Sequence, residues 1–327
     1  MIATLTMNPS IDLLCESDVV DLAGHKTRCS AALPRPGGGG INVAREVRAL
    51  GGEVIAIHAC GGPGGEQLVE LLDAEGLPQR PVRISGSTRR NIALSARNGE
   101  QRLHLVFPGP TLGRDEYQAC AGALLELDPL PDYVVLSGSL APGVPHDFYA
   151  DLARRCTERG SRVIVDTSGP ALESVLQAGV FLVKPNRHEF ERLFGLDPGN
   201  CDSCIAEMEA LIARGGARAI VVTLGGEGAL LVGEGYRVQL CPPPVEAGNA
   251  VAAGDTLVAA LVHRLDLDGG LLEGLASGVA AAAAVVSSGD AEVRDADSRR
   301  ALREQVEMKE LPPPVAAGQG KTRGARR

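Results

Sequence analysis

The strongest constraint on this chain is its alternation of short apolar runs with segments of helical pattern. Runs such as VIAIHAC at 54–60 and RVIVDTS at 162–168 are mostly apolar, as strands buried on both faces of a sheet are. Helix-like segments lie between such runs, at 41–50, 146–158 and 203–213. This order predicts an α/β fold, with helices on both faces of a mostly parallel sheet. With 44% hydrophobic residues among 327, a sizeable core is expected.

Two segments, about 11–35 and 82–107, interrupt this order. They carry polar, alternating stretches such as TRRNIALSAR and QRLHLVF, which lack the character of buried strands. We therefore expect a small antiparallel sheet that projects from the core and covers a ligand as a lid. Because no long linker divides the chain, residues 1–310 are predicted to form one domain. The Pro/Gly-rich and basic residues 311–327 have the composition of a disordered tail.

Composition argues against several classes of protein. A net charge of −9 and only 3% aromatic residues disfavour a nucleic-acid-binding surface. The chain has no apolar stretch of membrane-spanning length and no signal-peptide pattern at its start, so we expect a cytoplasmic protein without a membrane partner. The eight cysteines are scattered and expected to be reduced, and the pair Cys201 and Cys204 lacks the second pair that a zinc site needs.

Four consecutive glycines, at 37–40, lead into a predicted helix. Glycines let a backbone approach a ligand closely, and the helix start offers free N–H groups. Pro34 and Pro36 stand where a dinucleotide-binding fold needs a buried strand, and no Gly-Lys-Ser/Thr triplet follows for a Walker A loop. The alternative is that the glycines only permit a tight turn.

Lysine is rare in this chain, with four lysines among 32 basic residues. Two of them, Lys26 and Lys184, lie in the body of the chain, where a compact ammonium suits a phosphate group. The alternative is a solvated surface lysine at each position. The stretches KTR at 26–28 and TRR at 88–90 fall in the two lid segments, so their cations could meet over one anionic group.

Two predicted strand ends carry polar or glycine-rich sequence. Asn186 and Glu189 follow the strand in VKPNRHEF, where their oxygens could hold Mg²⁺ through water. The strand in VVTLGGEGALLV ends at Thr223 and is followed by Gly225 and Gly228, although a β-hairpin uses such glycines as well.

The stretch VAAGDTLVAALVHRL at 251–265 can form an apolar helix with one carboxylate, Asp255, near its start. An aspartate there can accept hydrogen bonds from free backbone N–H groups, so capping is the simplest interpretation of this residue alone. The rest of the chain has to show whether Asp255 does more.

Taken in chain order, seven segments resemble the PfkB/ribokinase family of carbohydrate kinases. They are TLTMNPSID, PGGGGINVA, SGSLAPGV, VDTSG, VKPNRHE, VTLGGEGALLV and VAAGDTLVAAL, and the resemblance spans about residues 3–308. Within the family the chain is most similar to the hexose-phosphate kinases, because GGGGINVAR is preceded by Lys26, Arg28 and Cys29. Family members that act on fructose 1-phosphate or tagatose 6-phosphate usually carry lysine in place of Gly39.

The resemblance implies a ribokinase-like three-layer α/β/α sandwich whose β-sheet lid forms a homodimer interface. It implies ATP- and Mg²⁺-dependent phosphorylation of a hexose phosphate, with fructose 6-phosphate converted to fructose 1,6-bisphosphate as the first candidate reaction. Asp255 would be the general base, and the amides of Ala252, Ala253 and Gly254 would form the anion hole. The implied sugar-phosphate ligands are Asp12, Lys26, Arg28, Gly38, Gly39, Asn42, Arg89 and Ser139. The implied nucleotide ligands are Lys184, Asn186, Thr223, Gly225 and Gly228, with Asn186 and Glu189 organising Mg²⁺ through water.

The chain departs from the family pattern at Ala252, where glycine is usual, and at Ala250, where serine or threonine is usual. If residue 252 needs φ above zero, its methyl group costs about 1 kcal/mol or more. A monovalent-cation site around 249–251, which some family members have, is open to the same question. These departures motivate one alternative, a non-catalytic protein that binds nucleotide or sugar phosphate. Within the family, the alternatives are a 1-phosphofructokinase or a tagatose-6-phosphate kinase.

Overall fold

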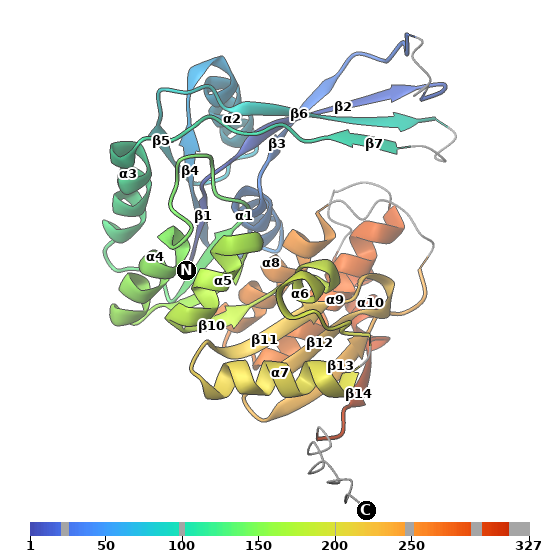
Figure 1. Ribbon diagram of the computed structural model, residues 1–327. Helices are drawn as coiled ribbons and strands as arrows, with labels where there is room; N and C mark the ends of the chain where they lie inside the picture. Colours follow the sequence, from blue (N-terminus) through green and yellow to red (C-terminus); the bar gives the residue numbers. More distant parts are fainter. Residues whose placement is uncertain (21–25, 98–101, 200, 246–251, 289–295, 314–327) are drawn as a thin grey trace, which may run out of the picture.

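The computed structural model describes residues 1–20, 26–97, 102–199, 201–245, 252–288 and 296–313 (Figure 1). Within these ranges the central sheet has ten strands in the order β14-β13-β12-β11-β10-β9-β8-β1-β4-β5. Its strands are β14 (Glu307–Glu310), β13 (Tyr236–Cys241), β12 (Ala229–Gly233), β11 (Ala217–Thr223), β10 (Val180–Val183), β9 (Arg162–Asp166), β8 (Tyr133–Ser137), β1 (Ile2–Thr6), β4 (Val54–Cys60) and β5 (Gln79–Arg83). The pairs from β11 to β5 are parallel, and those from β11 to β14 are antiparallel, which confirms a mostly parallel sheet.

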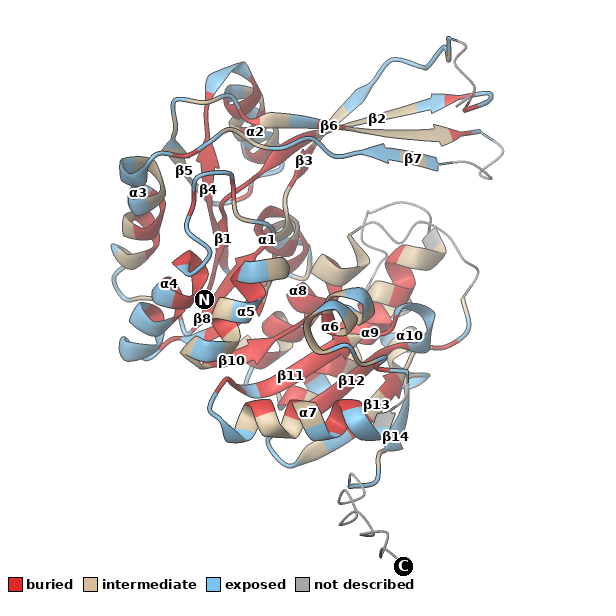
Figure 2. Cartoon of the chain, viewed as in Figure 1, coloured by how far each residue is buried: buried red, intermediate tan, exposed pale blue. Residues whose placement is uncertain are grey.

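Helices cover both faces of this sheet and bury it in two separate hydrophobic clusters (Figure 2). One face packs against α3 (Arg114–Leu125), α4 (Phe148–Glu158), α5 (Gly169–Ala178), α6 (Arg187–Phe194) and α7 (Cys201–Ala213). The other packs against α1 (Gly39–Ala49), α2 (Gly62–Ala74), α8 (Ala253–Asp266) and α9 (Leu271–Ser288), and α10 (Ala296–Glu304) lies beside α9. In β8, Val134 and Leu136 join the first cluster while Tyr133 and Val135 join the second, because successive side chains of a strand point to opposite faces. This is the expected three-layer α/β/α sandwich.

A second, smaller sheet projects from the core, at the top of Figure 1, and we call it the lid. Its described strands are β3 (Leu33–Gly37), β2 (Ser10–Ser17), β6 (Arg89–Ala96) and β7 (Arg102–Leu105), in the order β3-β2-β6-β7. The prediction of an antiparallel lid is wrong at its central pair, because β2 and β6 are parallel. The reason lies in the core: β2 continues from β1 and β6 follows β5, and β1 and β5 run in the same direction in the central sheet.

Three further expectations concern a membrane span, the cysteine pair and the C-terminal tail. None of the described helices is long and apolar enough to span a membrane. Among the described residues no group of three or more His, Cys, Asp or Glu side chains could hold a metal, and Cys204 donates its thiol hydrogen to the Asp197 carbonyl at 3.1 Å. Most of the predicted tail, 314–327, lies outside the described residues.

Candidate active site

The carboxyl ends of five neighbouring strands, β11, β10, β9, β8 and β1, meet the first residues of two helices at one edge of the central sheet. The start of α1 lies against the end of β8, and the start of α8 lies near Lys184, directly after β10. In open α/β sheets, ligands bind outside the carboxyl ends of the strands. Two helix starts also direct free N–H groups to the same place, which favours an anionic ligand.

The glycine run 37–40 packs tightly on the strand ends. A Cβ atom at Gly39 would lie 2.4 Å from Ser137 Oγ, and one at Gly37 would lie 2.5 Å from Asp12 Oδ2. Gly38, the N-cap of α1, has φ of 121°, a conformation that side chains rarely adopt. The glycines are therefore more than a tight turn, because they bring the start of α1 against β8 and against Asp12.

Asp255 lies in the first turn of α8, as its third residue after Ala253 and Gly254. Its Oδ2 accepts a hydrogen bond from Asn42 Nδ2 on α1 at 2.8 Å, across 213 residues of sequence. Burial and the nearby Asp166 carboxylate raise the pKa of Asp255 to about 7, against the opposing effects of Asn42 and Lys184. Asp255 is nevertheless only partly buried, so a ligand can reach it. A carboxylate in this state is suited to accept a proton near neutral pH, which is more than a helix cap requires.

Lys184 places its ammonium between the acidic residues of this edge. Its Nζ forms a buried ion pair with Asp166 Oδ1 at 3.0 Å, and the side chain is 5% exposed. Burial lowers the pKa of Lys184, but Asp166, together with Glu189 and Asp255, more than offsets this and raises it, so the lysine stays charged. A Cβ atom at Gly254 would lie 3.6 Å from Nζ, so the ammonium adjoins the start of α8. The alternative of a solvated lysine is thereby wrong at this position.

Ala252, the N-cap of α8, adopts φ of 65° and ψ of 0°, the left-handed region that favours glycine. The methyl group is therefore strained by about 1 kcal/mol or more. Alanine, like glycine, carries a backbone N–H, so Ala252, Ala253 and Gly254 each still present an N–H group at the helix start. The predicted monovalent-cation site around 249–251 lies outside the described residues.

Asn186 and Glu189 form a capping box at the start of α6. Glu189 N donates to Asn186 Oδ1 at 2.9 Å, and Asn186 N donates to Glu189 Oε2 at 2.8 Å. Burial and Asp166 raise the pKa of Glu189, while Asn186 and Lys184 oppose this. The side-chain oxygens of Asn186 and Glu189 are hard donors of the kind that Mg²⁺ prefers. Because Asn186 Oδ1 and Glu189 Oε2 already accept from backbone N–H groups, contact with Mg²⁺ through water fits them better than direct coordination.

Thr223, Gly225 and Gly228 lie at the end of β11 and in the turn to β12, next to the α6 start. Thr223 pairs with Asn186 in an isolated bridge, so both loops adjoin the same edge. Gly225 begins a 3₁₀ turn, Gly225–Glu227, with φ of 63°, and a Cβ at Gly228 would lie 1.9 Å from the Leu240 carbonyl oxygen. The β11–β12 hairpin therefore needs Gly228 for its own packing, whether or not a nucleotide binds there.

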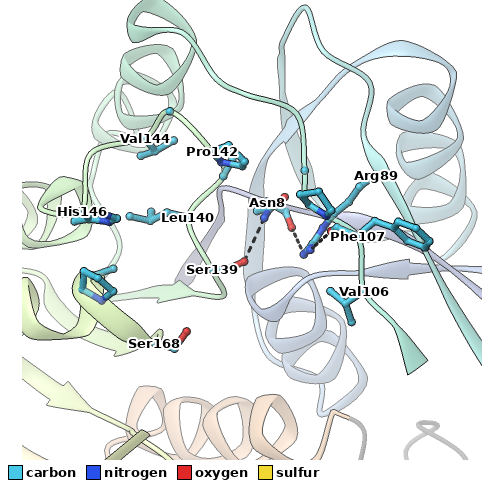
Figure 3. Close-up of a pocket in the computed structure, with 16 residues that line it drawn as sticks. Asn8, Arg89, Val106, Phe107, Ser139, Leu140, Pro142, Val144, His146 and Ser168 are labelled. Atoms are coloured by element: carbon cyan, nitrogen blue, oxygen red, sulfur yellow. Dashed lines mark hydrogen bonds between the residues drawn. The ribbon is translucent and has the colours of Figure 1, made fainter. Parts of the chain in front are cut away.

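A pocket of about 490 Å³ lies where the lid meets the core, and Asn8, Arg89 and Ser139 are among its lining residues (Figure 3). The Arg89 guanidinium donates to the Phe107 carbonyl at 2.9 Å and to the Asn8 carbonyl at 2.8 Å. Asn8 Nδ2 in turn donates to Ser139 Oγ at 3.2 Å. Burial lowers the pKa of Arg89 and Asp12 opposes this. The pocket thus presents a fixed cation, although Asp255 does not line it.

Lys26 and Arg28 do not join Arg89 in the described part of the chain. The Arg28 carbonyl accepts from Ser17 Oγ at 3.0 Å, at the far end of β2, whereas Arg89 pairs with Ser10 at its beginning. At about 3.3 Å per residue, these ends of β2 lie roughly 20 Å apart. The expected cluster of three cations over one anion is therefore not formed within one chain.

Sequence reasoning missed Asp166 and Asn91 as members of this region. Asp166 ends β9 in the stretch VDTSG, and its position at a strand end beside the other strand ends is the signal that could have found it. Asn91 follows TRR on β6 and donates to Asp12 Oδ1 at 2.8 Å. No pattern within β6 marks it, because its partner lies on another strand.

Comparison with known proteins shows a phosphotransferase that acts on an alcohol group of a sugar. Residues 5–296 match the pfkB family of carbohydrate kinases, and the chain belongs to this family. It is 37% identical to the ATP-dependent 6-phosphofructokinase isozyme 2 of Escherichia coli K12 over 284 residues, 86% of this chain and 91% of the relative. It is 35% identical over 266 residues to the 1-phosphofructokinase of Xanthomonas campestris, 80% and 83% of the two chains.

Solved structures agree with the fold. Phosphofructokinase-2 from Escherichia coli in complex with potassium has a TM-score of 0.87 and 35% identity, over 93% of this chain and 98% of the other. The tetrameric inhibited form of the same enzyme has a TM-score of 0.85 and the same identity and coverage. The ribokinase-like sandwich with a separate lid is thus confirmed, as is the sugar-kinase class.

Proposed function

We propose that this chain transfers the γ-phosphoryl group of ATP to a hydroxyl group of a hexose phosphate, with fructose 6-phosphate as the first candidate substrate. The observation that carries the proposal is Asp255, whose pKa lies near 7 at the start of a helix with free amides. A base of this pKa can accept a proton at neutral pH from the hydroxyl that attacks. The amides and the Lys184 ammonium lie where the charge of the transferring phosphoryl group would be stabilised.

In this reaction the sugar hydroxyl loses its proton to Asp255 while its oxygen bonds to the γ-phosphorus. The bond between that phosphorus and the β–γ bridging oxygen breaks, and ADP leaves. Mg²⁺, organised through water by Asn186 and Glu189, would neutralise phosphate charge when bound. Lys184, Thr223, Gly225 and Gly228 would adjoin the nucleotide on the same edge of the sheet.

The other end of the site supports a substrate that already carries a phosphate. Arg89 presents a cation held by two backbone carbonyls, and Asp12 lies one strand away on β2. Asp12 would accept hydrogen bonds from sugar hydroxyls, and Gly38, Gly39, Asn42 and Ser139 would complete the sugar site. In a kinase for an unphosphorylated sugar, the Arg89 guanidinium would have no substrate phosphate to bind.

Fructose 1-phosphate and tagatose 6-phosphate remain alternative substrates, since relatives named for both reactions match at 35% and 33% identity. Gly39 supports fructose 6-phosphate as the first candidate, because family members that act on the other two sugars usually carry lysine at this position. A coupled assay of ADP release over the three sugar phosphates tests the proposal. Turnover on none of them would rule it out.

The variant Asp255→Asn separates catalysis from a role in the helix start. We expect kcat to fall on the order of 10²-fold or more while the fold is retained. Asp151→Asn is the matched control, because Asp151 also lies in the first turn of a helix, α4, but is exposed. Equal kcat in both variants would mean that Asp255 only caps the helix and is not the base. A wild-type chain that binds ATP and sugar phosphate in calorimetry but shows no turnover would instead favour a non-catalytic binding protein.

We also propose a homodimer that forms through the lid. The lid exposes large apolar side chains, Val19, Leu33 and Leu105, at 62%, 54% and 41%. A second copy could bring Lys26 and Arg28 to the Arg89 of another chain, which one chain does not do. Mixing Lys26→Ala/Arg28→Ala chains with Asp255→Asn chains tests this: the mixed dimer should regain activity that neither parent has. A monomeric mass in sedimentation, or no recovery, would contradict it.

A further inference from the structure

The Asn91 side chain is buried on β6, 4% exposed, between the two residues proposed to hold the sugar phosphate. Its Nδ2 donates to Asp12 Oδ1 at 2.8 Å and to Ser10 Oγ at 3.0 Å. Ser10 Oγ also donates to Asp12 Oδ1, at 2.8 Å. Two donors therefore converge on one oxygen of the Asp12 carboxylate, and bonds to a charged group are the stronger kind.

The orientation of the Asn91 amide is fixed at both ends. Its Oδ1 accepts a hydrogen bond from the Phe107 amide at 3.1 Å, while Nδ2 faces the carboxylate. The reverse orientation would place an oxygen against Asp12 and two donors against each other at Phe107. The buried amide thus has one arrangement in which its described partners are satisfied, and that arrangement holds Asp12.

The hydrogen bonds to Asp12 within the described residues all end on Oδ1. The second oxygen, Oδ2, lies against Gly37, where a Cβ atom would approach it to 2.5 Å. Gly37 leads directly into Gly38 and Gly39 and the start of α1. The network therefore leaves Oδ2 beside the glycine run, where the sugar hydroxyls are proposed to bind.

The same amide is linked to the phosphate end of the site. Phe107 donates its N–H to Asn91 and accepts from Arg89 Nη1 through its carbonyl, so residue 107 connects the two side chains. Asn91 thereby contacts the acceptor for the sugar hydroxyls directly and the phosphate-binding cation through one peptide unit.

We propose that Asn91 is a positioning residue for the sugar phosphate, which holds the Asp12 carboxylate with Oδ2 toward the sugar and fixes residue 107 beneath Arg89. This inference rests on the proposed function. Asn91→Ala removes the donor to Asp12, and Asn91→Asp keeps the shape but presents an oxygen to that carboxylate. In both variants we expect KM for the sugar phosphate to rise about tenfold or more, with KM for ATP changed less than about twofold.

A double-mutant cycle shows whether Asn91 acts through Asp12. In an Asp12→Ala background, Asn91→Ala should raise the sugar-phosphate KM by a smaller factor than in the wild-type background, because only the link through residue 107 to Arg89 remains. An effect of the same size in both backgrounds would overturn the proposal. So would an equal rise in KM for ATP, because that is what a general loosening of the fold produces.

The control is Gln67→Ala on α2. Gln67 Oε1 accepts a hydrogen bond from Arg90, the neighbour of Asn91 on β6, at 3.2 Å on the exposed side of the lid. We expect wild-type KM values for this variant, and a rise equal to that of Asn91→Ala would overturn the proposal. Wild-type chain without turnover on any hexose phosphate would instead refute the proposed function, so the two failures are distinguishable.

Discussion

Replacing Ala252 by glycine should stabilise this protein, although glycine usually destabilises the interior of a helix. Ala252 has φ of 65°, and an L-residue in this region carries about 1–2 kcal/mol of strain that glycine does not. The larger conformational freedom of glycine in the unfolded chain offsets about 0.5–1 kcal/mol of this gain. We therefore expect Ala252→Gly to raise the free energy of unfolding by about 0.5–1 kcal/mol.

Ala253→Gly is the matched control, one residue further along the same backbone. Ala253 is the first helical residue of α8 and is not among the described residues with positive φ. Without strain to relieve, the same substitution should lower the free energy of unfolding by a few tenths to about 1 kcal/mol. The two variants differ by one position and are expected to differ in sign.

Thermal unfolding followed by circular dichroism measures both variants against the parent chain. For a chain of this size, the change expected in Ala252→Gly corresponds to an increase in Tm of roughly 1–3 °C. Because the N–H groups at the helix start are retained, kcat should stay equal or rise. A lower Tm in Ala252→Gly, or equal shifts in the two variants, would refute the assignment of strain to this residue.

Four further outcomes are expected. kcat/KM should rise with pH around 7, because Asp255 must lose its proton before it can act as a base. Asp166→Asn removes a carboxylate that raises the pKa of Asp255, so the rise should occur at lower pH in this variant. Above pH 7 the folded chain holds Asp255 as an ionised carboxylate, which burial disfavours. Asp255→Asn should therefore raise the free energy of unfolding there by ~1–4 kcal/mol, seen as a higher Tm, and this gain should be lost below about pH 4. Lys184→Met leaves Asp166 without its buried partner and should cost about 3 kcal/mol in urea unfolding. Gly39→Ala places Cβ 2.4 Å from Ser137 Oγ and should cost about 1–3 kcal/mol of stability and lower kcat/KM.

The central sheet could be predicted from the sequence because its strands are buried on both faces. A strand buried on both faces needs apolar residues at nearly every position, as in VIAIHAC. In the structure, β4 spans that same stretch, Val54–Cys60. The direction of the lid pairing could not be predicted in this way. Alternation of polar and apolar residues shows which face of a strand is buried, but it carries no information on whether the neighbouring strand is parallel.

In the site, too, features within one element could be predicted, but contacts between elements far apart in the sequence could not. Asp255 could be recognised as a residue at a helix start, but its partner Asn42 lies 213 residues away, and only the packing of α1 on α8 joins them. The sequence places Lys26, Arg28 and Arg89 in lid segments, which predicts that their charges meet. In the structure, Arg28 and Arg89 lie at opposite ends of β2, a separation that the sequence pattern does not show.

The lid joins the core through four short segments, 7–9, 38, 84–88 and 106–113. Asn8 and Gly38 lie in two of these segments, Phe107 lies in a third, and Arg89 directly follows the fourth. Two of these connecting segments also line the pocket in Figure 3, through Asn8 and Phe107, and so does Arg89 at the start of β6. A ligand in this pocket would therefore contact the lid at Arg89 and the core at Ser139 at the same time.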